Sequence, residues 1–580
     1  MKILLLALNA KYIHTSLALR YIKAYCKEYE GLIHILETSI NNNENEIIKA
    51  IYRQKPDVIG ISCYIWNMSY VKQLIPILKK ILPDTTIILG GPEVSYNSEE
   101  LLMNYDVDLI MEGEGEATWQ EYLDYRLKHK YVLEDIAGLV YKNSNGEIYK
   151  TKSRQPLDLS TLPFVYDNME GLDHKIIYYE ASRGCPFNCQ YCLSSIEQGV
   201  RFVPVETVKK HMAYFLDKRV KQVKFVDRTF NTRKQFAMEI WRYIINHDNG
   251  YTNFHFEIAA ELITEEMYTV LENARPGLIQ FEIGVQSTNP KVLNIIKRPM
   301  PFEDIKKVVL RIKKMNNIHQ HLDLIAGLPE EDYTSFRQSF IDVMSVRPEQ
   351  FQLGFLKLLK GSGLRENAES FGLVYKAEPP YEILYTSSIS YDEILRLHSI
   401  DELVDKYYNS GRFSHTLEYL FGCLGNPFDF FEQFSIFWES KGYDLMEHNK
   451  IAYYLHLIEF GHHNAAINEE LLKEIIRYDY LLNEPVNEMP LQFETINREQ
   501  LKLFYNQLLK DDNWLGKTLP HLIPLVPRQR YKLTHLEAFH YPIWLENPGD
   551  QSYTKRLFSQ KKVLFDYSKT PVKPLLIDEE

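Results

Sequence analysis

The segment SRGCPFNCQYC, residues 182–192, follows a strand-like apolar run and determines the fold that we expect around it. It places Cys185, Cys189 and Cys192, three of the six cysteines, at C-x3-C-x2-C spacing within eight residues. Thiolates at this spacing on one loop can ligate an iron–sulfur cluster. A structural zinc site usually has four ligands in two separated pairs, and a second pair is missing, so zinc is the less favoured alternative. Three local thiolates would leave one iron of a [4Fe–4S] cube open to a small molecule.

Strand-like runs alternate with helical stretches on both sides of this segment. The six expected strands are residues 175–182, 222–228, 254–260, 278–285, 321–327 and 350–358. Helical patterns lie between them, for example at 205–218 and 301–315. Six successive βα units predict a partial (β/α)6 barrel of the TIM type over residues 175–360. The carboxyl ends of its strands, where the cysteines also lie, are the expected place of function.

Residues 1–130 show the same alternation ahead of the barrel. Five strands are expected at 2–8, 33–39, 57–65, 85–91 and 108–116, which predicts a doubly wound, Rossmann-like parallel sheet. Three loops at strand ends are NAKYIH (9–14), GGPEVS (90–95) and GEGE (113–116). No G-x-G-x-x-G follows the first strand and no P-loop occurs, so a nucleotide site is a weak interpretation. Three such loops at one sheet edge nevertheless favour a ligand site over simple turns.

The rest of the chain carries fewer signals. Residues 131–174 are predicted to be a connector, with a hairpin over 139–151 that turns at Asn145–Gly146. Residues 361–580 are predicted to form a mainly helical domain, with helix 469–482 as an example and strands after about residue 530. The overall class is therefore α/β.

Composition excludes several classes of protein. The 580 residues are 45% hydrophobic and 25% charged, which is ordinary for a globular chain, and six cysteines are too few for a disulfide scaffold. A net charge of −12 does not suit a general nucleic-acid binder. No apolar run reaches the ~18 residues of a membrane span, and the N-terminus lacks a signal-peptide cleavage pattern, so we expect a cytoplasmic location.

The cysteine motif after the first strand of a partial barrel resembles the radical S-adenosylmethionine (SAM) superfamily. FVDRTFN (225–231), FEI (256–258), EIGVQSTNPKVLNIIKR (282–298) and DLIAGLPEE (323–331) resemble the branch that contains oxygen-independent coproporphyrinogen dehydrogenase and the elongator catalytic subunit. The resemblance implies that Cys185, Cys189 and Cys192 hold a catalytic [4Fe–4S] cluster, which reductively cleaves SAM to a 5′-deoxyadenosyl radical. It also implies SAM contacts by Tyr191, Asp227, Glu257, Gln286, Arg298 and Asp323.

A doubly wound domain before such a barrel resembles the cobalamin-binding class. The whole chain is similar to cobalamin (vitamin B12)-binding radical SAM proteins that carry a C-terminal domain of unknown function. This resemblance implies cobalamin contacts by Asn9, His14, Gly90, Gly91, Pro92, Glu93, Gly113, Glu114, Gly115 and Glu116. The D-x-H-x-x-G loop that donates a cobalt ligand in many cobalamin proteins is absent, so we expect base-off cobalamin without a histidine ligand. His14 is the only histidine in a strand-end loop of this domain.

These implications lead to one leading hypothesis and two alternatives. The first is a radical SAM enzyme that transfers a methyl group from methylcobalamin to an unactivated carbon. The second is a cyclase or rearranging enzyme with the same cofactors, and the third is an iron–sulfur redox sensor, which would need no SAM contacts. A low-potential donor such as flavodoxin or ferredoxin is the expected partner, the substrate is unknown, and neither nucleic acid nor membrane is expected. Residues 361–580 are expected to cap the barrel mouth, or else to serve as an accessory domain.

Overall fold

The computed structural model describes residues 1–143, 145–196, 199–298, 300–485, 490, 493, 498–545 and 554–577. They form two compact units. The first contains Met1–Pro348 and Leu353–Ile394, and the second contains Glu349–Gln352 and Leu395–Glu580. The first unit therefore continues past residue 360, where we expected the barrel to end.

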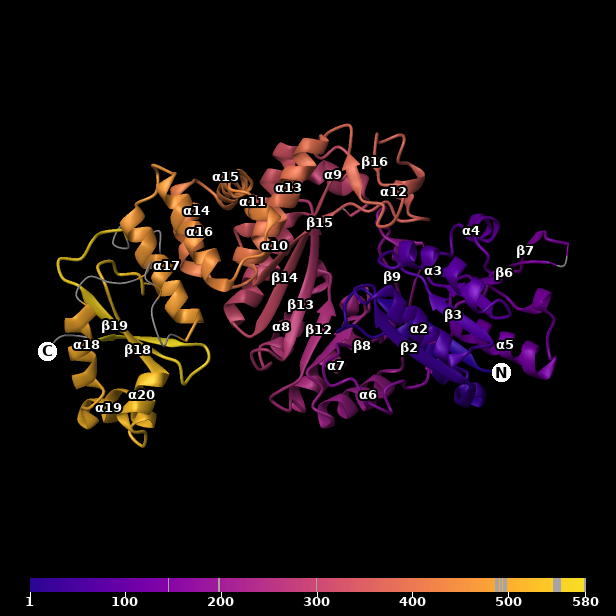
Figure 1. The fold of residues 1–580 in the computed structure, drawn as a ribbon, viewed down its shortest axis with the longest axis horizontal. Helices are drawn as coiled ribbons and strands as arrows, with labels where there is room; N and C mark the ends of the chain where they lie inside the picture. The colour runs from indigo at the N-terminus through magenta and orange to yellow at the C-terminus, as the bar shows by residue number, and fades with distance from the viewer. Residues whose placement is uncertain are drawn as a thin grey trace. The chain divides into compact units, whose positions relative to one another are not determined.

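A seven-stranded sheet forms the N-terminal part of the first unit (Figure 1). Its spatial order is β2 (Ile33–Ser39), β1 (Ile3–Asn9), β3 (Val58–Ser62), β4 (Thr86–Gly90), β5 (Leu109–Met111), β6 (Leu139–Lys142) and β7 (Ile148–Lys150). The first five are parallel neighbours, which confirms the predicted parallel sheet. The hairpin predicted at 139–151 is also confirmed, as β6 and β7, and it extends the same sheet with antiparallel pairing.

Helices cover both faces of this sheet. On one face lie α1 (Leu17–Tyr25) and α5 (Gly115–Lys128), and on the other α2 (Glu44–Gln54), α3 (Met68–Ile81) and α4 (Ser98–Asn104). Successive strand residues point to opposite faces. Leu4 and Leu6 accordingly join the core with α2 and α3, whereas Leu5 joins the core with α1 and α5. A strand buried on both faces is apolar throughout, which is why β1 is a continuous run of hydrophobic residues.

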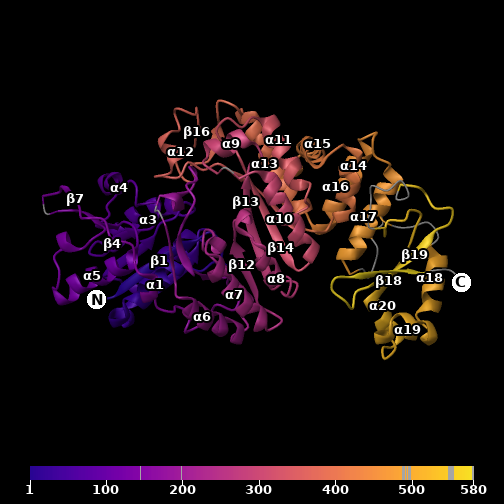
Figure 2. The same cartoon turned by 180° about the vertical axis from the view of Figure 1, so that it is seen from behind.

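A second sheet of six strands follows in the chain (Figure 2). Its order is β8 (Ile177–Tyr179), β11 (Gln222–Phe225), β12 (Asn253–Glu257), β13 (Ile279–Gln286), β14 (Ile318–Ala326) and β15 (Gln350–Phe355). The helices between these strands are α6 (Val205–Asp217), α7 (Lys234–Asn246), α8 (Glu265–Leu271), α9 (Pro290–Ile295), α10 (Phe302–Met315) and α11 (Tyr333–Met344). All six predicted strands are present in sequential order, as the predicted partial barrel requires.

The sequence did not predict a short antiparallel ribbon that carries the first cysteine. Strand β9 (Ser182–Cys185) pairs with β10 (Gly199–Phe202). Gly184 has a φ of +101°, and a Cβ there would collide with the carbonyl oxygen of Gly199. Glycine is therefore required immediately before Cys185.

After β15, the first unit continues through α12 (Gly363–Glu366), β16 (Val374–Tyr375) and β17 (Ile383–Tyr385). The second unit is mainly helical, as predicted. Its helices are α13 (Tyr391–Leu403, which begins in the first unit), α14 (Ser414–Cys423), α15 (Pro427–Ser440), α16 (Lys450–His462), α17 (Glu469–Asn483), α18 (Arg498–Leu508), α19 (Asp512–Thr518) and α20 (Pro527–Leu533). The strands predicted after residue 530 are β18 (Thr534–Phe539), β19 (Lys561–Asp566) and β20 (Lys573–Ile577), which form an antiparallel sheet.

A buried polar cluster joins two helices of the second unit. The carboxylate of Asp479 on α17 accepts hydrogen bonds from the backbone N–H and hydroxyl of Thr416 and from Nδ1 of His415, on α14. Asp479 is fully buried. Since a buried carboxylate is costly unless it is bonded, this contact fixes the packing of α14 on α17.

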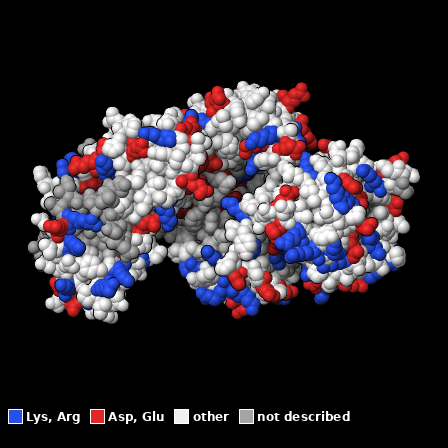
Figure 3. All heavy atoms as spheres, viewed as in Figure 1, with Lys and Arg blue, Asp and Glu red and all other residues white. Residues whose placement is uncertain are grey.

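The surface gives no simple electrostatic signal. On the face drawn in Figure 3, basic and acidic side chains are interspersed. Within the described residues, no helix combines the length and the apolar character needed to cross a bilayer.

Candidate functional site

The three cysteines of the C-x3-C-x2-C motif lie around one cavity in the barrel. Cys185 ends β9, whereas Cys189 and Cys192 lie in the loop that follows. The middle of this loop is held by Gln190, whose N–H donates to Ile296 and whose carbonyl accepts from Leu364. All six cysteines are described, and none forms a disulfide.

Polar groups from other barrel segments lie beside the sulfurs of Cys185 and Cys189. The guanidinium of Arg298 donates from Nη1 to Sγ of Cys189 at 3.7 Å, and the Thr229 hydroxyl lies 3.7 Å from Sγ of Cys185. Burial raises the pKa of the Cys185 thiol. Donors to sulfur stabilise thiolates and tune a cluster bound by them.

The cavity around the cysteines measures about 240 Å³. Its other polar walls come from the carboxyl ends of successive strands: Glu257 on β12, Glu282 and Gln286 on β13, and Asp323 on β14, with Arg298 beyond α9. Gln286 has a φ of +72°, which is a strained conformation for this residue, and a β-bulge lies beside it. Strain of this kind concentrates at functional sites.

Of the side chains predicted to contact SAM, the structure brings Tyr191, Glu257, Gln286, Arg298 and Asp323 to this cavity, but not Asp227. Asp227 is 1% exposed, and its carboxylate accepts from the hydroxyl of Ser182 and the N–H of Ala181. It therefore braces the start of β9, and the next residue, Arg228, faces the cavity instead.

Glu282 is a cavity residue that the sequence analysis missed. It precedes Gly284 and Gln286 at the two-residue spacing of one strand face, which was a usable signal. Burial raises its pKa, but hydrogen bonds from His255 and Lys224 outweigh burial and bring the pKa to about 2. Glu257 lacks such close partners, and burial raises its pKa to about 7. Of the three carboxylates that line the cavity, Glu282 is therefore ionised at neutral pH and Glu257 titrates near neutrality.

A wider cavity of about 780 Å³ lies between the N-terminal sheet and the barrel, within the first unit. Residues expected around cobalamin line it from all three strand-end loops: Asn9, His14, Gly91, Pro92, Gly113, Glu114, Gly115 and Glu116. Tyr64 and Trp66 stack on each other at its wall, with ring centroids 4.4 Å apart. A broad cavity bounded by glycine loops and flat rings matches a planar macrocycle in shape.

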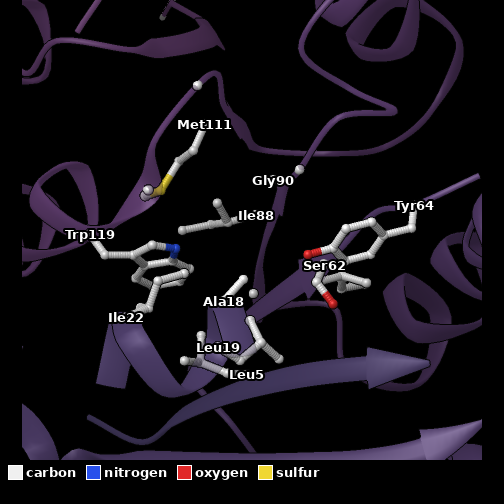
Figure 4. Close-up of a pocket in the computed structure, with 15 residues that line it drawn as sticks. Leu5, Ala18, Leu19, Ile22, Ser62, Tyr64, Ile88, Gly90, Met111 and Trp119 are labelled. Atoms are coloured by element: carbon white, nitrogen blue, oxygen red, sulfur yellow. The ribbon is translucent and has the colours of Figure 1, made fainter. Parts of the chain in front are cut away.

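A narrow apolar pocket of about 100 Å³ opens from the same sheet edge (Figure 4). Leu5, Ile22, Ile88, Met111 and Trp119 line it, together with Gly90. It shares Gly91, Gly113 and Gly115 with the wide cavity. A Cβ at Gly91 would lie 2.6 Å from the carbonyl oxygen of Cys63, so only glycine fits this turn.

His14 is held by a barrel residue. Its Nδ1 lies 2.7 Å from the hydroxyl of Tyr178 on β8. Burial, together with the charges of Lys11 and Lys224, lowers the pKa of His14. The imidazole is therefore mostly neutral at pH 7, and its Nδ1 is hydrogen-bonded to the hydroxyl of Tyr178.

Two predicted cobalamin contacts, Glu114 and Glu116, form ion pairs with the ribbon that carries Cys185. Arg183 on β9 lies 3.1 Å from Glu114 and 3.0 Å from Glu116, and it also pairs with Glu180 at 2.8 Å. Arg201 on β10 also pairs with Glu114. These ion pairs connect the GEGE loop of the N-terminal sheet directly to the cysteine ribbon.

A third predicted contact, Glu93, is 2% exposed and lies outside both cavities. It accepts a hydrogen bond from Tyr381, from the segment after the barrel. In the turn 361–364 of that segment, Gly361 packs against the ring of Tyr96 and Gly363 packs against the side chain of Gln190. One short turn thus contacts Tyr96, the residue after the GGPEVS loop, and the cysteine loop.

The residues present fit a cluster better than a single metal ion. Among the described residues, no three histidine, cysteine or acidic side chains gather closely enough to hold one ion. The three cysteines instead line one cavity together, and cysteine thiolates are the usual ligands of iron–sulfur clusters. The glycine loops and the apolar pocket likewise suit a corrinoid and its tail.

Comparison with known protein families gives three matches along the chain. Residues 3–123 match the B12 binding domain, residues 179–342 match the radical SAM superfamily, and residues 369–565 match a family of unknown function, DUF4080. The chain therefore joins a B12-binding domain to a radical SAM domain. These two domains imply three cofactors, a [4Fe–4S] cluster, SAM and cobalamin, and the need for a reductant.

Among curated proteins, an uncharacterized methyltransferase of Pyrococcus horikoshii is 26% identical over 329 residues, or 54% of this chain and 70% of that protein. The cobalamin-dependent radical SAM methyltransferase TokK of Streptomyces tokunonensis is 24% identical over 55% of this chain and 50% of its own length. The match thus spans only half of TokK. Among solved structures, the cobalamin-dependent radical enzyme OxsB is similar in fold, with a TM-score of 0.57 at 15% identity over 91% of this chain and 83% of that one. TsrM of Kitasatospora setae has a TM-score of 0.54 at 16% identity, over 65% of this chain and 76% of that one.

Proposed function

We propose that this chain, which joins a B12-binding domain to a radical SAM domain, is a cobalamin-dependent methyltransferase that acts on an unactivated carbon. One observation carries the proposal: the three cysteines share a cavity with the expected SAM contacts, and a wide cavity lined by the cobalamin loops adjoins it. Two of the similar proteins, from Pyrococcus horikoshii and Streptomyces tokunonensis, are named as methyltransferases.

In this proposal, Cys185, Cys189 and Cys192 hold the cluster. When bound, the reduced cluster supplies the electron that cleaves SAM and releases a 5′-deoxyadenosyl radical. Arg298 pairs with the carboxylate of SAM, for which its forked guanidinium is suited. Glu257 and Asp323 accept hydrogen bonds from the ribose, Gln286 also lies within reach of it, and Tyr191 lies against the adenine.

The loops of the N-terminal sheet hold cobalamin, which when bound supplies the methyl group. Asn9, Gly91, Pro92, Gly113 and Gly115 form its bed, and the narrow pocket beside Gly90 receives its nucleotide tail. The carboxylates of Glu93, Glu114 and Glu116 serve mainly to position these loops, since each already has a partner outside the sheet. The protein's contribution is to keep two reactive centres at facing strand ends.

The test is anaerobic reconstitution of the full chain with iron, sulfide and hydroxocobalamin. We expect both iron–sulfur and cobalt to be retained, and we expect 5′-deoxyadenosine and S-adenosylhomocysteine after addition of SAM and a chemical reductant. Cys185→Ala should remove the cluster absorbance and both products, whereas Cys423→Ala, far along the chain on α14, should remove neither. Retention of iron without cobalt would contradict the cobalamin assignment.

Two alternatives remain distinguishable by products. A cyclase or rearranging enzyme would form 5′-deoxyadenosine without S-adenosylhomocysteine. A redox sensor would form neither, and the polar side chains gathered opposite the three thiols speak against it. For the electron donor we propose a low-potential carrier such as flavodoxin or ferredoxin, in the cytoplasm.

A further inference from the structure

We propose that Arg228 binds an anionic group of the substrate, a carboxylate or a phosphate, at the junction of the two cavities. This inference rests on the proposed function, because it assumes that the substrate lies between the SAM site and cobalamin. It adds a chemical class to a substrate that is otherwise unspecified.

The position of Arg228 is the first observation. It is the one residue that lines both the cavity of the cysteines and the wide cavity, among the residues that the structure describes. Its charge acts on Tyr64 from the N-terminal sheet and on Glu257 from the barrel. A molecule that reaches from one cavity to the other must pass this guanidinium.

The second observation is that the charge of Arg228 is little used by the protein. Its ion pair with Glu257 spans 4.0 Å, which is too long for a direct hydrogen bond, and its side chain is 58% exposed. The carboxylates that line the wide cavity have closer partners, because Glu114, Glu116 and Glu180 all lie within 3.1 Å of Arg183. In the barrel, Glu282 pairs with Lys224 at 3.0 Å. The Arg228 guanidinium is thus the cation best placed to receive an anion from outside.

The third observation is that the backbone on both sides of Arg228 is fixed. Asp227 is bonded to Ala181 and Ser182, and the amide of Asn231 exchanges two hydrogen bonds with the backbone of Ala259. A rigid backbone lowers the entropy cost of holding a guanidinium in one direction. The fork of Arg matches a carboxylate or a phosphate through two parallel hydrogen bonds.

The test uses ligand-detected NMR titrations of the anaerobic holoenzyme, loaded with cluster, hydroxocobalamin and SAM. The probes are phenyl phosphate, benzoate and the neutral benzyl alcohol. We expect at least one anion to bind about tenfold or more tightly than benzyl alcohol, as a charged hydrogen-bonded pair would give. The tighter of the two anions identifies phosphate or carboxylate as the group.

The variants are Arg228→Gln, Arg228→Lys and, as a matched control, Arg242→Gln, which removes the same charge from an exposed position on α7. Arg228→Gln should abolish the preference for the anion, Arg228→Lys should keep part of it, and Arg242→Gln should keep all of it. Cluster and cobalamin absorbance confirm that each variant is folded and loaded.

Equal binding of anions and benzyl alcohol by the wild type, or an unchanged preference in Arg228→Gln, would overturn the inference. So would a loss in Arg228→Gln that is confined to SAM affinity, which would assign the guanidinium to SAM. Failure of the proposed function is a separate result: the loaded wild type would then form no 5′-deoxyadenosine, whatever its anion binding.

Discussion

The hydroxyl of Tyr381 donates a hydrogen bond of 2.8 Å to Oε2 of Glu93. It joins the segment after the barrel to a strand-end loop of the N-terminal sheet, 288 residues earlier in the chain. Lys360 adds its charge at 3.9 Å from the same oxygen. A buried carboxylate of the GGPEVS loop is thus held by the segment that follows the barrel.

Removal of the Tyr381 hydroxyl should destabilise the GGPEVS loop. In Tyr381→Phe, Glu93 keeps its burial but loses its hydroxyl partner, and an unsatisfied buried acceptor costs about 1–3 kcal/mol. We expect a lower thermal midpoint and weaker binding of hydroxocobalamin, measured by its absorbance. Tyr385→Phe is the control, since Tyr385 is 45% exposed. Equal cobalamin affinity in the two variants would show that the bond to Glu93 does not support the loop.

Asp227 should make stability depend on pH. Burial raises the pKa of its carboxyl to about 7 in the folded chain, against about 3.9 when unfolded. The folded state therefore binds the extra proton between these values, and stability falls as pH rises through that window. Asp227→Asn has no such proton. We expect the thermal midpoint of the wild type to fall relative to Asp227→Asn between pH 5 and 8, and parallel curves would refute the buried acid.

Glu257 should make SAM binding depend on pH. Its pKa of about 7 means that the carboxylate, which accepts hydrogen bonds from the ribose in our proposal, is mostly protonated at pH 6 and mostly ionised at pH 8. Affinity should therefore rise by up to about tenfold over this range, following the ionised fraction. Isothermal titration of Glu257→Gln should give weaker binding without this rise. If the affinity of Glu257→Gln for SAM still rises with pH, a group other than Glu257 is responsible for the rise.

His415 should stabilise the second unit mainly at lower pH. Burial alone lowers its pKa, but the hydrogen bond to Asp479 outweighs burial and raises it above the ordinary value. Stability gained in this way is complete below the unfolded pKa of about 6.5 and is lost as pH rises through the folded value. The advantage of the wild type over His415→Gln in thermal midpoint should be larger at pH 5.5 than at pH 8.5. An advantage of equal size at the two pH values would contradict a stabilising role of the protonated imidazole.

Local sequence was sufficient to predict an element whose ends are set by neighbouring residues. The strand at 33–39 has the predicted ends, because the residues that set them lie within a few positions of each other in the sequence. The cavity of the cysteines was largely predictable as well, since parallel strands bring their carboxyl ends to one edge whatever the loops do.

Distant partners were the main source of error. Asp227 and Arg228 are neighbours in sequence, and only the bonds of Asp227 to Ala181 and Ser182 decide which of them faces the cavity. Similarly, the pattern GEGE suggests a ligand loop, but nothing in it announces that Arg183 will engage its two carboxylates. The ribbon of β9 and β10 was missed because four residues rich in glycine and cysteine show no alternation of polar and apolar side chains.

The turn 361–364 carries a consequence for how the holoprotein assembles. Gly361 packs against Tyr96, next to the GGPEVS loop, and the N–H of Leu364 donates to the carbonyl of Gln190, between Cys189 and Cys192. A cofactor that orders the chain at one end of this turn lowers the entropy cost of ordering the chain at the other end. Protein that already holds its iron and sulfide should therefore bind vitamin B12 more tightly than apoprotein does. Because thermodynamic linkage is reciprocal, bound vitamin B12 should raise the affinity for iron and sulfide by the same factor.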